Sequence, residues 1–258
     1  MPQRIEFERD LFSASGLTLL VDGDAQSHVD LDDATRLFFE YTRRIGHVFD
    51  VVGDPQGAPT APIRALHLGG GAFTLPRYLA ATRPGSDQLV VEIDAELVAL
   101  VQEQAPLPPR SGITVTVADA ATEVGRLAAG HPFDVVVVDL YVGLHIPAFA
   151  LTADFVTACA RLVAPGGALV WNIADVAGLG RLTTLVELVR RTTPMLALVA
   201  AGTSDVVDGT AEGNIVLVAA TQPSLSRIAQ ALGERGPFPV AVRNDAAPDS
   251  LQARMPEN

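Results

Sequence analysis

The chain has 258 residues, of which 48% are hydrophobic and 19% are charged. This length and composition are typical of one large globular domain with its own core, and they exclude wholesale disorder. Eighteen basic and thirty acidic residues give a formal net charge of -12. Because such a charge repels phosphate backbones and anionic membranes, neither nucleic acid nor a membrane is an expected partner. A cationic ligand suits this field, although a solvated acidic surface is the commoner cause.

The single cysteine and the N-terminus bear on the cellular compartment. Cys159 has no partner for an intrachain disulfide, which fits a reducing compartment. The N-terminus lacks the apolar segment of a secretory signal, and no apolar run approaches the about 20 residues that span a bilayer. The sequence therefore predicts a cytoplasmic protein.

Residues 1–60 are expected to form a small N-terminal β-hairpin module and a linking helix. Extended segments at Arg4–Leu11 and Leu17–Val21, and a third run to Val29, flank the turn Asp22-Gly23-Asp24. Asp32 or Asp33 can cap a helix whose apolar positions recur at helical spacing, namely Leu37, Phe38, Tyr41, Ile45 and Val48. Pro and Gly over 50–62 then predict a boundary near residue 60.

Residues 61–232 alternate between strand-like and helical segments. Apolar strand runs occur at Ile63–Leu68, Leu89–Ile93, Ile113–Val117, Val135–Val138 and Ala168–Ile173. Strands of this kind are covered on both faces, which predicts an α/β domain with a doubly wound parallel sheet. Met195–Ala200 and Ile215–Ala220 are expected to add an antiparallel pair and so give seven strands. Residues 233–258, rich in Pro, Ala and charge, are predicted to be a flexible tail.

A glycine cluster and an acidic residue mark a predicted nucleotide site. Gly69, Gly70 and Gly71 follow the first sheet strand, where glycines let a ligand approach the backbone, although such clusters also make ordinary turns. Glu92 ends the next strand at the spacing from which a carboxylate reaches ribose hydroxyls. Asp94 is assigned the simpler role of helix cap.

A third strand ends in Asp119-Ala120. The Asp119 carboxylate can accept a hydrogen bond from an adenine amino group, or it can cap the following helix. Because the three strand ends meet at the carboxyl edge of the sheet, we expect one nucleotide crevice there. No histidine has Cys or His companions at zinc spacing, so no metal site is expected.

Several motifs share their order and spacing with one enzyme family. They are Val21-Asp22-Gly23-Asp24-Ala25-Gln26, Gly69-Gly70-Gly71, Val91-Glu92-Ile93-Asp94, Asp119-Ala120, Val137-Val138-Asp139 and Leu162-Val163-Ala164-Pro165-Gly166-Gly167. With them the sequence resembles the spermidine synthase family of polyamine aminopropyltransferases, particularly its short bacterial, actinobacterial-like branch, over approximately residues 16–220. The resemblance implies an S-adenosylmethionine-methyltransferase-like, Rossmann-like fold and a homodimer.

The resemblance also implies roles for particular residues. Gln26 would approach the nucleoside or amine, Glu92 the ribose and Asp119 the adenine. Asp139 would occupy the catalytic position, where a carboxylate accepts the proton of an amine that attacks the aminopropyl carbon of decarboxylated S-adenosylmethionine. Apart from the resemblance, Tyr141 and His145 lie in a loop that can cover the site, and Trp171-Asn172 ends the fifth strand beside it. These four are further candidates, with Tyr141 expected to bind substrate.

The sequence departs from the family at informative positions. Ala72 stands where members carry an aspartate for the donor ammonium, and Val142 where they carry a second acidic residue. Phe38-Phe39-Glu40 replaces the usual polar pair before a glutamate.

Three functions stay open. The first is an aminopropyltransferase that moves an aminopropyl group to an amine such as a polyamine, with Asp139 as base and Asp175 as a substitute carboxylate. The second is a methyltransferase or another small-molecule transferase that uses intact S-adenosylmethionine. The third is a non-catalytic binding or scaffold protein that keeps the fold.

Overall fold

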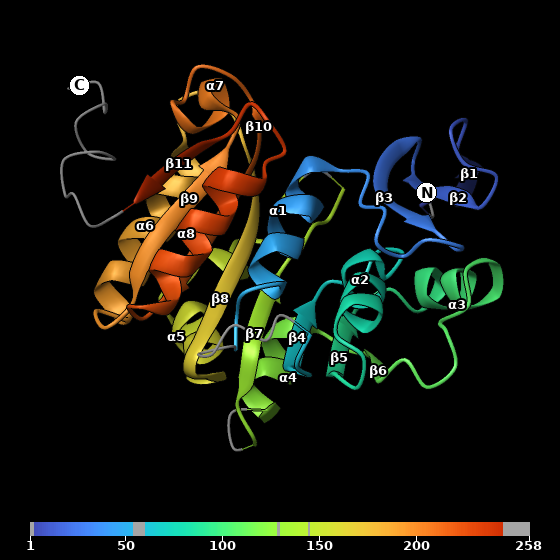
Figure 1. Ribbon diagram of the computed structural model, residues 1–258, viewed down its shortest axis with the longest axis horizontal. Coiled ribbons are helices and arrows are strands. Elements are labelled where there is room, and N and C mark those ends of the chain that lie inside the picture. The colour runs from blue at the N-terminus through green and yellow to red at the C-terminus, as the bar shows by residue number, and fades with distance from the viewer. Residues whose placement is uncertain (1–2, 54–59, 128–129, 144, 245–258) are drawn as a thin grey trace.

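The computed structural model describes residues 3–53, 60–127, 130–143 and 145–244, which form two β-sheets (Figure 1). A three-stranded sheet, in the order β1-β2-β3, belongs to the N-terminal module. An eight-stranded sheet, in the order β11-β9-β10-β8-β7-β4-β5-β6, forms the centre of the main domain. The predicted α/β class with a β-hairpin module is therefore confirmed.

The N-terminal module is an antiparallel meander of β1 (Ile5–Arg9), β2 (Gly16–Val21) and β3 (Asp24–Asp30). A buried polar network holds its ends together. Arg36 Nη1 lies 2.6 Å from an Asp10 oxygen and 3.1 Å from an Asp30 oxygen, and His28 Nε2 lies 3.0 Å from the same Asp10 oxygen. The Phe12 backbone N–H, which donates to Asp10, and the Arg36 and His28 contacts together hold the pKa of Asp10 low, at about 2. Ion pairs and hydrogen bonds within the module therefore stabilise its structure.

The linking helix α1 (Glu40–Phe49) begins later than the sequence predicts, after the N-cap residue Phe39. The two aspartates expected to cap it lie in a preceding turn. The backbone N–H groups of Asp32 and Asp33 donate to Asp30, and the Asp33 carboxylate accepts from Thr35. The cap prediction is wrong because these side chains satisfy the local turn instead.

The central sheet combines parallel and antiparallel pairs. Its strands are β4 (Arg64–Leu68), β5 (Asp87–Glu92), β6 (Ile113–Val117), β7 (Phe133–Val138), β8 (Val163–Asp175), β9 (Ala197–Gly202), β10 (Gly213–Ala220) and β11 (Ala241–Asn244). Strands β4 to β8 pair in parallel, while β10 lies antiparallel between β8 and β9. The predicted antiparallel pair is present, and β11 adds an eighth strand.

The predicted tail from residue 233 is wrong for its first part. Helix α8 (Ser224–Arg235) continues past residue 232, and β11 pairs antiparallel with β9. Ala241 and Val242 pack against the two opposite core clusters, and Arg243 Nη2 lies 2.7 Å from Asp208 Oδ1. In the sequence this short apolar pair is flanked by prolines and charged residues, so it does not form a recognisable strand pattern. The rest of the predicted tail, 245–258, lies outside the described residues.

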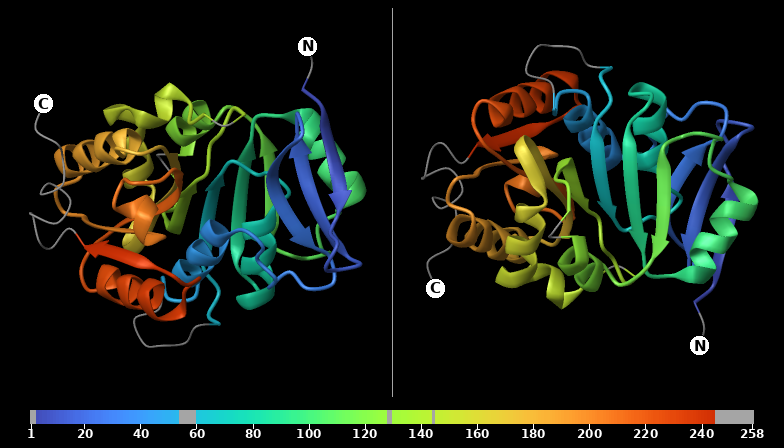
Figure 2. Two further views of the ribbon diagram at one scale, coloured as in Figure 1. Left: turned by 90° about the horizontal axis from the view of Figure 1, so that it is seen from above. Right: turned by 90° about the horizontal axis from the view of Figure 1, so that it is seen from below.

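Helices cover both faces of the central sheet, as Figure 2 shows from above and below. They are α2 (Thr74–Thr82), α3 (Ala95–Gln104), α4 (Ala120–Leu127), α5 (Ala153–Arg161), α6 (Gly180–Thr192), α7 (Ser204–Val207) and a 3₁₀ turn at Ala148–Leu151. Helices α1, α2 and α8 pack on one face, and α4, α5 and α6 on the other. None of the described helices is long and apolar enough to cross a membrane.

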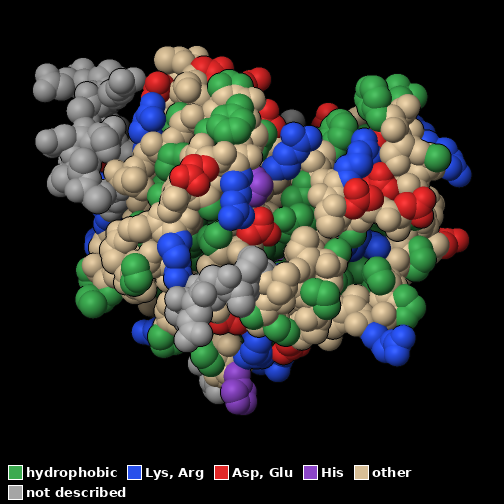
Figure 3. All heavy atoms as spheres, viewed as in Figure 1, with side chains coloured by type: hydrophobic (Ala, Val, Ile, Leu, Met, Phe, Trp, Pro, Cys, Tyr) green, Lys and Arg blue, Asp and Glu red, His purple; other side chains and the backbone are tan. Residues whose placement is uncertain are grey.

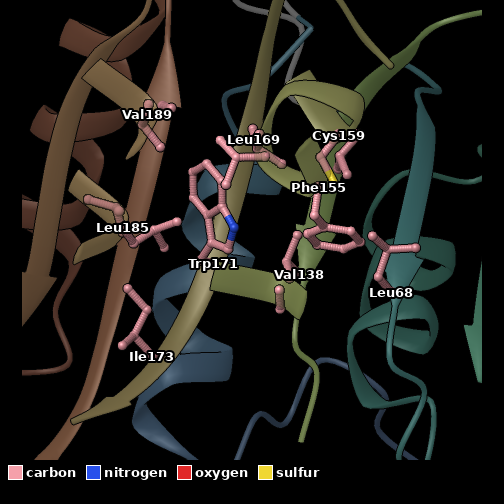
Figure 4. Close-up of a cluster of buried hydrophobic side chains, with 14 of the residues drawn as sticks. Leu68, Val138, Phe155, Cys159, Leu169, Trp171, Ile173, Leu185 and Val189 are labelled. Atoms are coloured by element: carbon pink, nitrogen blue, oxygen red, sulfur yellow. The ribbon is translucent and has the colours of Figure 1, made fainter. Parts of the chain in front are cut away.

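Side chains alternate between these two faces along each strand. In β8, Leu169, Trp171 and Ile173 enter the cluster beneath α5 and α6, where Figure 4 shows the Trp171 indole lying between Leu185 and Phe155. Val170, on the opposite face, packs toward α1 and α8. This two-sided burial fixes the strand ends, and the strand ends fix the site.

Candidate active site

A cavity of about 900 Å³ opens at the carboxyl ends of the parallel strands. Strand β3 of the N-terminal module forms one wall, and the loops after β4, β5, β6, β7 and β8 form the others. Most of the site residues proposed from the sequence line it: Gln26, Gly69, Gly70, Gly71, Glu92, Asp119, Ala120, Asp139, Tyr141 and Asp175. The topology therefore brings together residues from position 26 to position 175 of the chain, while their roles stay predictions.

The glycine loop lies against the end of β7. Gly69 has a φ of +95°, and a Cβ atom there would lie 2.1 Å from the Asp139 carbonyl oxygen. The Gly69 N–H donates to Val91 O and the Asp139 N–H to Leu68 O, so the loop and the catalytic candidate share one backbone framework. Glycine at this position is required by both the backbone conformation and the close approach.

Glu92 is held by the backbone on both sides. Its Oε2 accepts from the Gly70 N–H at 2.8 Å, and its Oε1 accepts from the Asp94 N–H at 3.0 Å. Each carboxylate oxygen keeps a further lone pair, and the partly exposed side chain lines the cavity. This arrangement can accept hydrogen bonds from a pair of hydroxyls. Asp94 caps α3 through Glu96 and Leu97, as predicted.

Asp119 both caps the following helix and faces the cavity. Its Oδ1 accepts from the Thr122 N–H and the Thr122 hydroxyl, each at 2.8 Å, so it caps α4. Its Oδ2 has no hydrogen-bond partner within the described part of the chain, and the side chain lines the cavity. A carboxylate fixed through one oxygen presents the other to an amino group.

Asp139 follows β7 and lies at the centre of a hydrogen-bonded group. Its Oδ1 accepts from Asn172 Nδ2 at 2.8 Å, and the Tyr41 hydroxyl also hydrogen-bonds to it. Burial raises the pKa of the Asp139 carboxyl to about 6, these two hydrogen bonds lower it, and the Glu92 charge raises it further. The group is thus poised to exchange a proton close to neutral pH.

Tyr41 is a site residue that sequence reasoning missed. Its side chain was expected to belong to the apolar face of the helix, but it lies in the first turn of α1 and lines the cavity. Burial and the Asp139 charge raise the pKa of its hydroxyl, so it stays a proton donor. Tyr41 was missed because the predicted helix begins too early, so that Tyr41 did not fall in its first turn.

Asn172 and Trp171 separate by strand alternation. Trp171 points into the core, where its indole nitrogen has no hydrogen-bond partner among the described residues, whereas Asn172 points into the cavity. Asn172 links Asp139 to Asn214, whose Nδ2 donates to Asn172 Oδ1 at 2.9 Å. Of the predicted pair, the structure therefore brings only Asn172 to the site.

The three substrate-binding candidates differ in how they are held. Gln26 precedes Ser27, whose hydroxyl lies 2.9 Å from the Thr74 hydroxyl at the start of α2. The Tyr141 hydroxyl donates to Asn172 O at 3.0 Å and accepts from the Ala174 N–H at 2.7 Å, so it anchors its loop to β8. Asp175 accepts from the backbone N–H groups of Val176 and Leu182, both at 2.9 Å.

Charges of both signs are interspersed over the face of the molecule seen in Figure 3. The cavity wall is different, because its charged side chains are acidic, apart from Arg181 among the described residues. No group of three or more His, Cys, Asp or Glu side chains arranged to hold a metal ion occurs in the described ranges.

Comparison with known proteins gives the wider context of this cavity. No family model matches the chain. The polyamine aminopropyltransferase of Chromobacterium violaceum is 28% identical over 147 residues, which are 57% of this chain and 53% of that protein. The crystal structure of a probable spermidine synthase from Corynebacterium glutamicum superposes with a TM-score of 0.83 and 26% identity, covering 100% of this chain and 93% of that one.

The chain is similar in sequence to polyamine aminopropyltransferases and in fold to spermidine synthases. It spans about half the length of the curated relative it matches, at 53%. A spermidine synthase in complex with the transition state analogue AdoDATO shares the fold, with a TM-score of 0.61 and 15% identity over 87% of this chain and 73% of that one. In this chain Ala72 is fully buried, and Val142 offers an apolar surface to the cavity.

Proposed function

We propose that the protein is an aminopropyltransferase that binds decarboxylated S-adenosylmethionine and transfers its aminopropyl group to an amine. The single observation that carries the proposal is the placement of Asp139 in the same cavity as Glu92 and Asp119. The nucleoside carboxylates follow the neighbouring strands β5 and β6, and the buried base candidate follows β7, which lies on the other side of β4 in the same parallel part of the sheet. The relative's name, polyamine aminopropyltransferase, and the AdoDATO complex of a structural neighbour support this donor class.

In the proposed reaction the amine nitrogen attacks the aminopropyl carbon next to the sulfonium. The carbon–sulfur bond breaks, its electron pair passes to sulfur, and neutral 5′-methylthioadenosine leaves. The amine loses one proton, which Asp139 accepts. Asn172 and Tyr41 hydrogen-bond to the Asp139 carboxylate and help to hold it in position. Glu92 would hold the ribose, Asp119 the adenine, and Gln26 would close the site from β3.

The pH dependence of turnover follows from Asp139. Because its pKa is raised to about 6, the carboxylate is ionised and able to accept a proton only above that pH. We expect kcat/KM to fall about tenfold per pH unit below pH 6. Initial rates between pH 5 and pH 9 measure this, and a profile that is flat from pH 5 to pH 7 would reject Asp139 as the base.

The experiment that tests the proposed function measures both products. Purified protein is incubated with decarboxylated S-adenosylmethionine and an amine, and 5′-methylthioadenosine and the aminopropylated amine are quantified by mass spectrometry. We expect the two products in equal amounts. Release of S-adenosylhomocysteine from intact S-adenosylmethionine, without aminopropylated product, would instead identify a methyltransferase.

That second candidate, methyl transfer, is favoured by the missing carboxylates at Ala72 and Val142 and by the presence of Arg181 on the wall. Such a cation can pair with the carboxylate that intact S-adenosylmethionine keeps. Binding of both donors without any product would support the non-catalytic alternative.

We also propose that the protein works as a cytoplasmic homodimer. The tip of the β1–β2 hairpin exposes Leu11 and Phe12, which are 93% and 83% accessible. Apolar side chains this exposed are typical of an interaction surface. Light scattering of the wild type and of Phe12→Ser tests this, and a monomeric wild type at micromolar concentration would contradict it.

A further inference from the structure

Arg181 is a cation that the proposed transfer chemistry does not use. It lies in the first turn of α6 and lines the cavity. Every other Asp, Glu, Lys or Arg described on the wall is acidic: Glu92, Asp94, Asp119, Asp139, Asp175 and Glu212. The presence of a guanidinium here calls for an explanation, because placing a cation in a cleft without a charged partner costs free energy.

The hydrogen bonding of Arg181 leaves most of its donors available. Its Nη1 donates to Ala174 O at 2.8 Å. Within the described part of the chain it forms no ion pair, and the neighbouring Asp175 already accepts from two backbone N–H groups. Since a guanidinium carries five N–H donors, Arg181 can still offer a paired set to a planar anion.

The position of Arg181 relative to Asp139 follows from β8. Asn172, which contacts Asp139, and Ala174, which contacts Arg181, are two residues apart on the same strand. The Tyr141 hydroxyl bridges them. Residues two apart in a strand are separated by roughly 6.5 Å. The cation and the proposed base therefore contact β8 at neighbouring positions on one wall of the cavity.

We propose that Arg181 binds a carboxylate carried by a substrate of this cavity. For an acceptor carboxylate the inference rests on the proposed function, because it assigns the substrate class of the same site, whereas a donor carboxylate would belong to the second candidate, methyl transfer. Two substrates supply this group: an acceptor with an amine at one end and a carboxylate at the other, or a donor that keeps the amino-acid carboxylate of S-adenosylmethionine.

The surroundings of Arg181 agree with such a zwitterionic ligand. Val142 and Val176 line the cavity and are 63% and 53% exposed, so they suit an aliphatic link. The second ammonium of a diamine would be repelled by the guanidinium, whereas a carboxylate forms a charge-assisted pair with it. At this point of the wall the guanidinium therefore favours a carboxylate over the second ammonium of a diamine.

Calorimetric binding with matched ligand pairs tests the inference without requiring turnover. The acceptor pair is 4-aminobutanoate against 1,4-diaminobutane, measured on protein saturated with 5′-methylthioadenosine and on free protein. The donor pair is S-adenosylmethionine against its decarboxylated form. We expect the carboxylate-bearing member of one pair to bind more tightly, and Arg181→Gln to reduce that preference by about 10- to 100-fold. The pair that responds identifies the source of the carboxylate.

The controls separate charge, geometry and folding. Arg191→Gln removes the same charge from the exposed end of the same helix and should leave both preferences unchanged. Arg181→Lys keeps a positive charge without the planar fork and should restore part of the preference. An unchanged melting temperature in Arg181→Gln shows that the variant is folded.

The inference is overturned if neither pair favours its carboxylate member in the wild type, or if Arg181→Gln leaves the ratio unchanged. The proposed function fails separately, when the favoured ligands bind but no group is transferred. The two failures are therefore distinguishable in the same samples.

Discussion

Replacing Asp139 by asparagine is expected to lower kcat by about 10²- to 10⁴-fold, the range that a positioned general base contributes. Asparagine has nearly the same shape, and its carbonyl oxygen can still accept from Asn172 Nδ2, which lies 2.8 Å from Oδ1 in the wild type. It cannot accept the amine proton. Steady-state rates of 5′-methylthioadenosine release measure the loss, and nucleoside affinity should change less than about threefold.

Asp139→Asn is also expected to raise the melting temperature at alkaline pH, although it lowers kcat. Because the folded-state pKa of Asp139 is raised from 3.8 to about 6, its protonated form stabilises the fold below pH 3.8, and this contribution is lost as the pH rises through 6. Asp139→Asn should therefore melt higher than the wild type at pH 8 and show no such gain at pH 4. Asp87→Asn, an exposed carboxylate paired with Arg64, is the control for a general charge effect. For the catalytic prediction, a kcat of Asp139→Asn within threefold of the wild-type value would show that Asp139 is not the general base.

Gly69→Ala is expected to destabilise the fold by about 3–5 kcal/mol, since a left-handed backbone and a direct collision act together. The φ of +95° is unfavourable for any residue with a Cβ, and this Cβ would meet the Asp139 carbonyl oxygen at 2.1 Å. Both colliding groups are backbone, so no side-chain rotation relieves the contact. The free energy of unfolding from urea titration measures the loss.

Gly23→Ala is the matched control for this effect. Gly23 has nearly the same φ, +92°, but a Cβ there would meet nothing within 4 Å. It should cost only the conformational part, about 1–2 kcal/mol. If the two substitutions destabilise equally, the contact between the glycine loop and the end of β7 is not as close as described.

The fold could be predicted from the sequence largely because its strands are buried on both faces. Runs such as Val135–Val138 are continuously apolar, and an element of this kind has few alternatives. Strand β11 was missed because its burial comes from only two residues, Ala241 and Val242, between prolines and charges. The start of α1 was missed because Asp32 and Asp33 satisfy a local turn.

The gathering of the nucleotide-site candidates at one cavity could be predicted because each candidate ends a strand, and parallel strands end at one edge. The acceptor end could be predicted only in part, through Asp139, Tyr141 and Asp175. Tyr41 and Asn214 reach Asp139 and Asn172 only through packing between elements far apart in the sequence. Arg181 looks like an ordinary helical arginine until β8 places Ala174 O beside it. Tertiary contacts of this kind leave no local pattern.

The most direct test of the account is a calorimetric titration of the wild type and Glu92→Ala with 5′-methylthioadenosine. The account predicts saturable binding to the wild type and a loss of about 10- to 100-fold in Glu92→Ala, because the ribose hydroxyls lose a charged acceptor. Glu92→Gln, which keeps one acceptor oxygen, should fall between the two. No binding to the wild type, or equal affinity in Glu92→Ala, would contradict the assignment of this cavity as a nucleoside site.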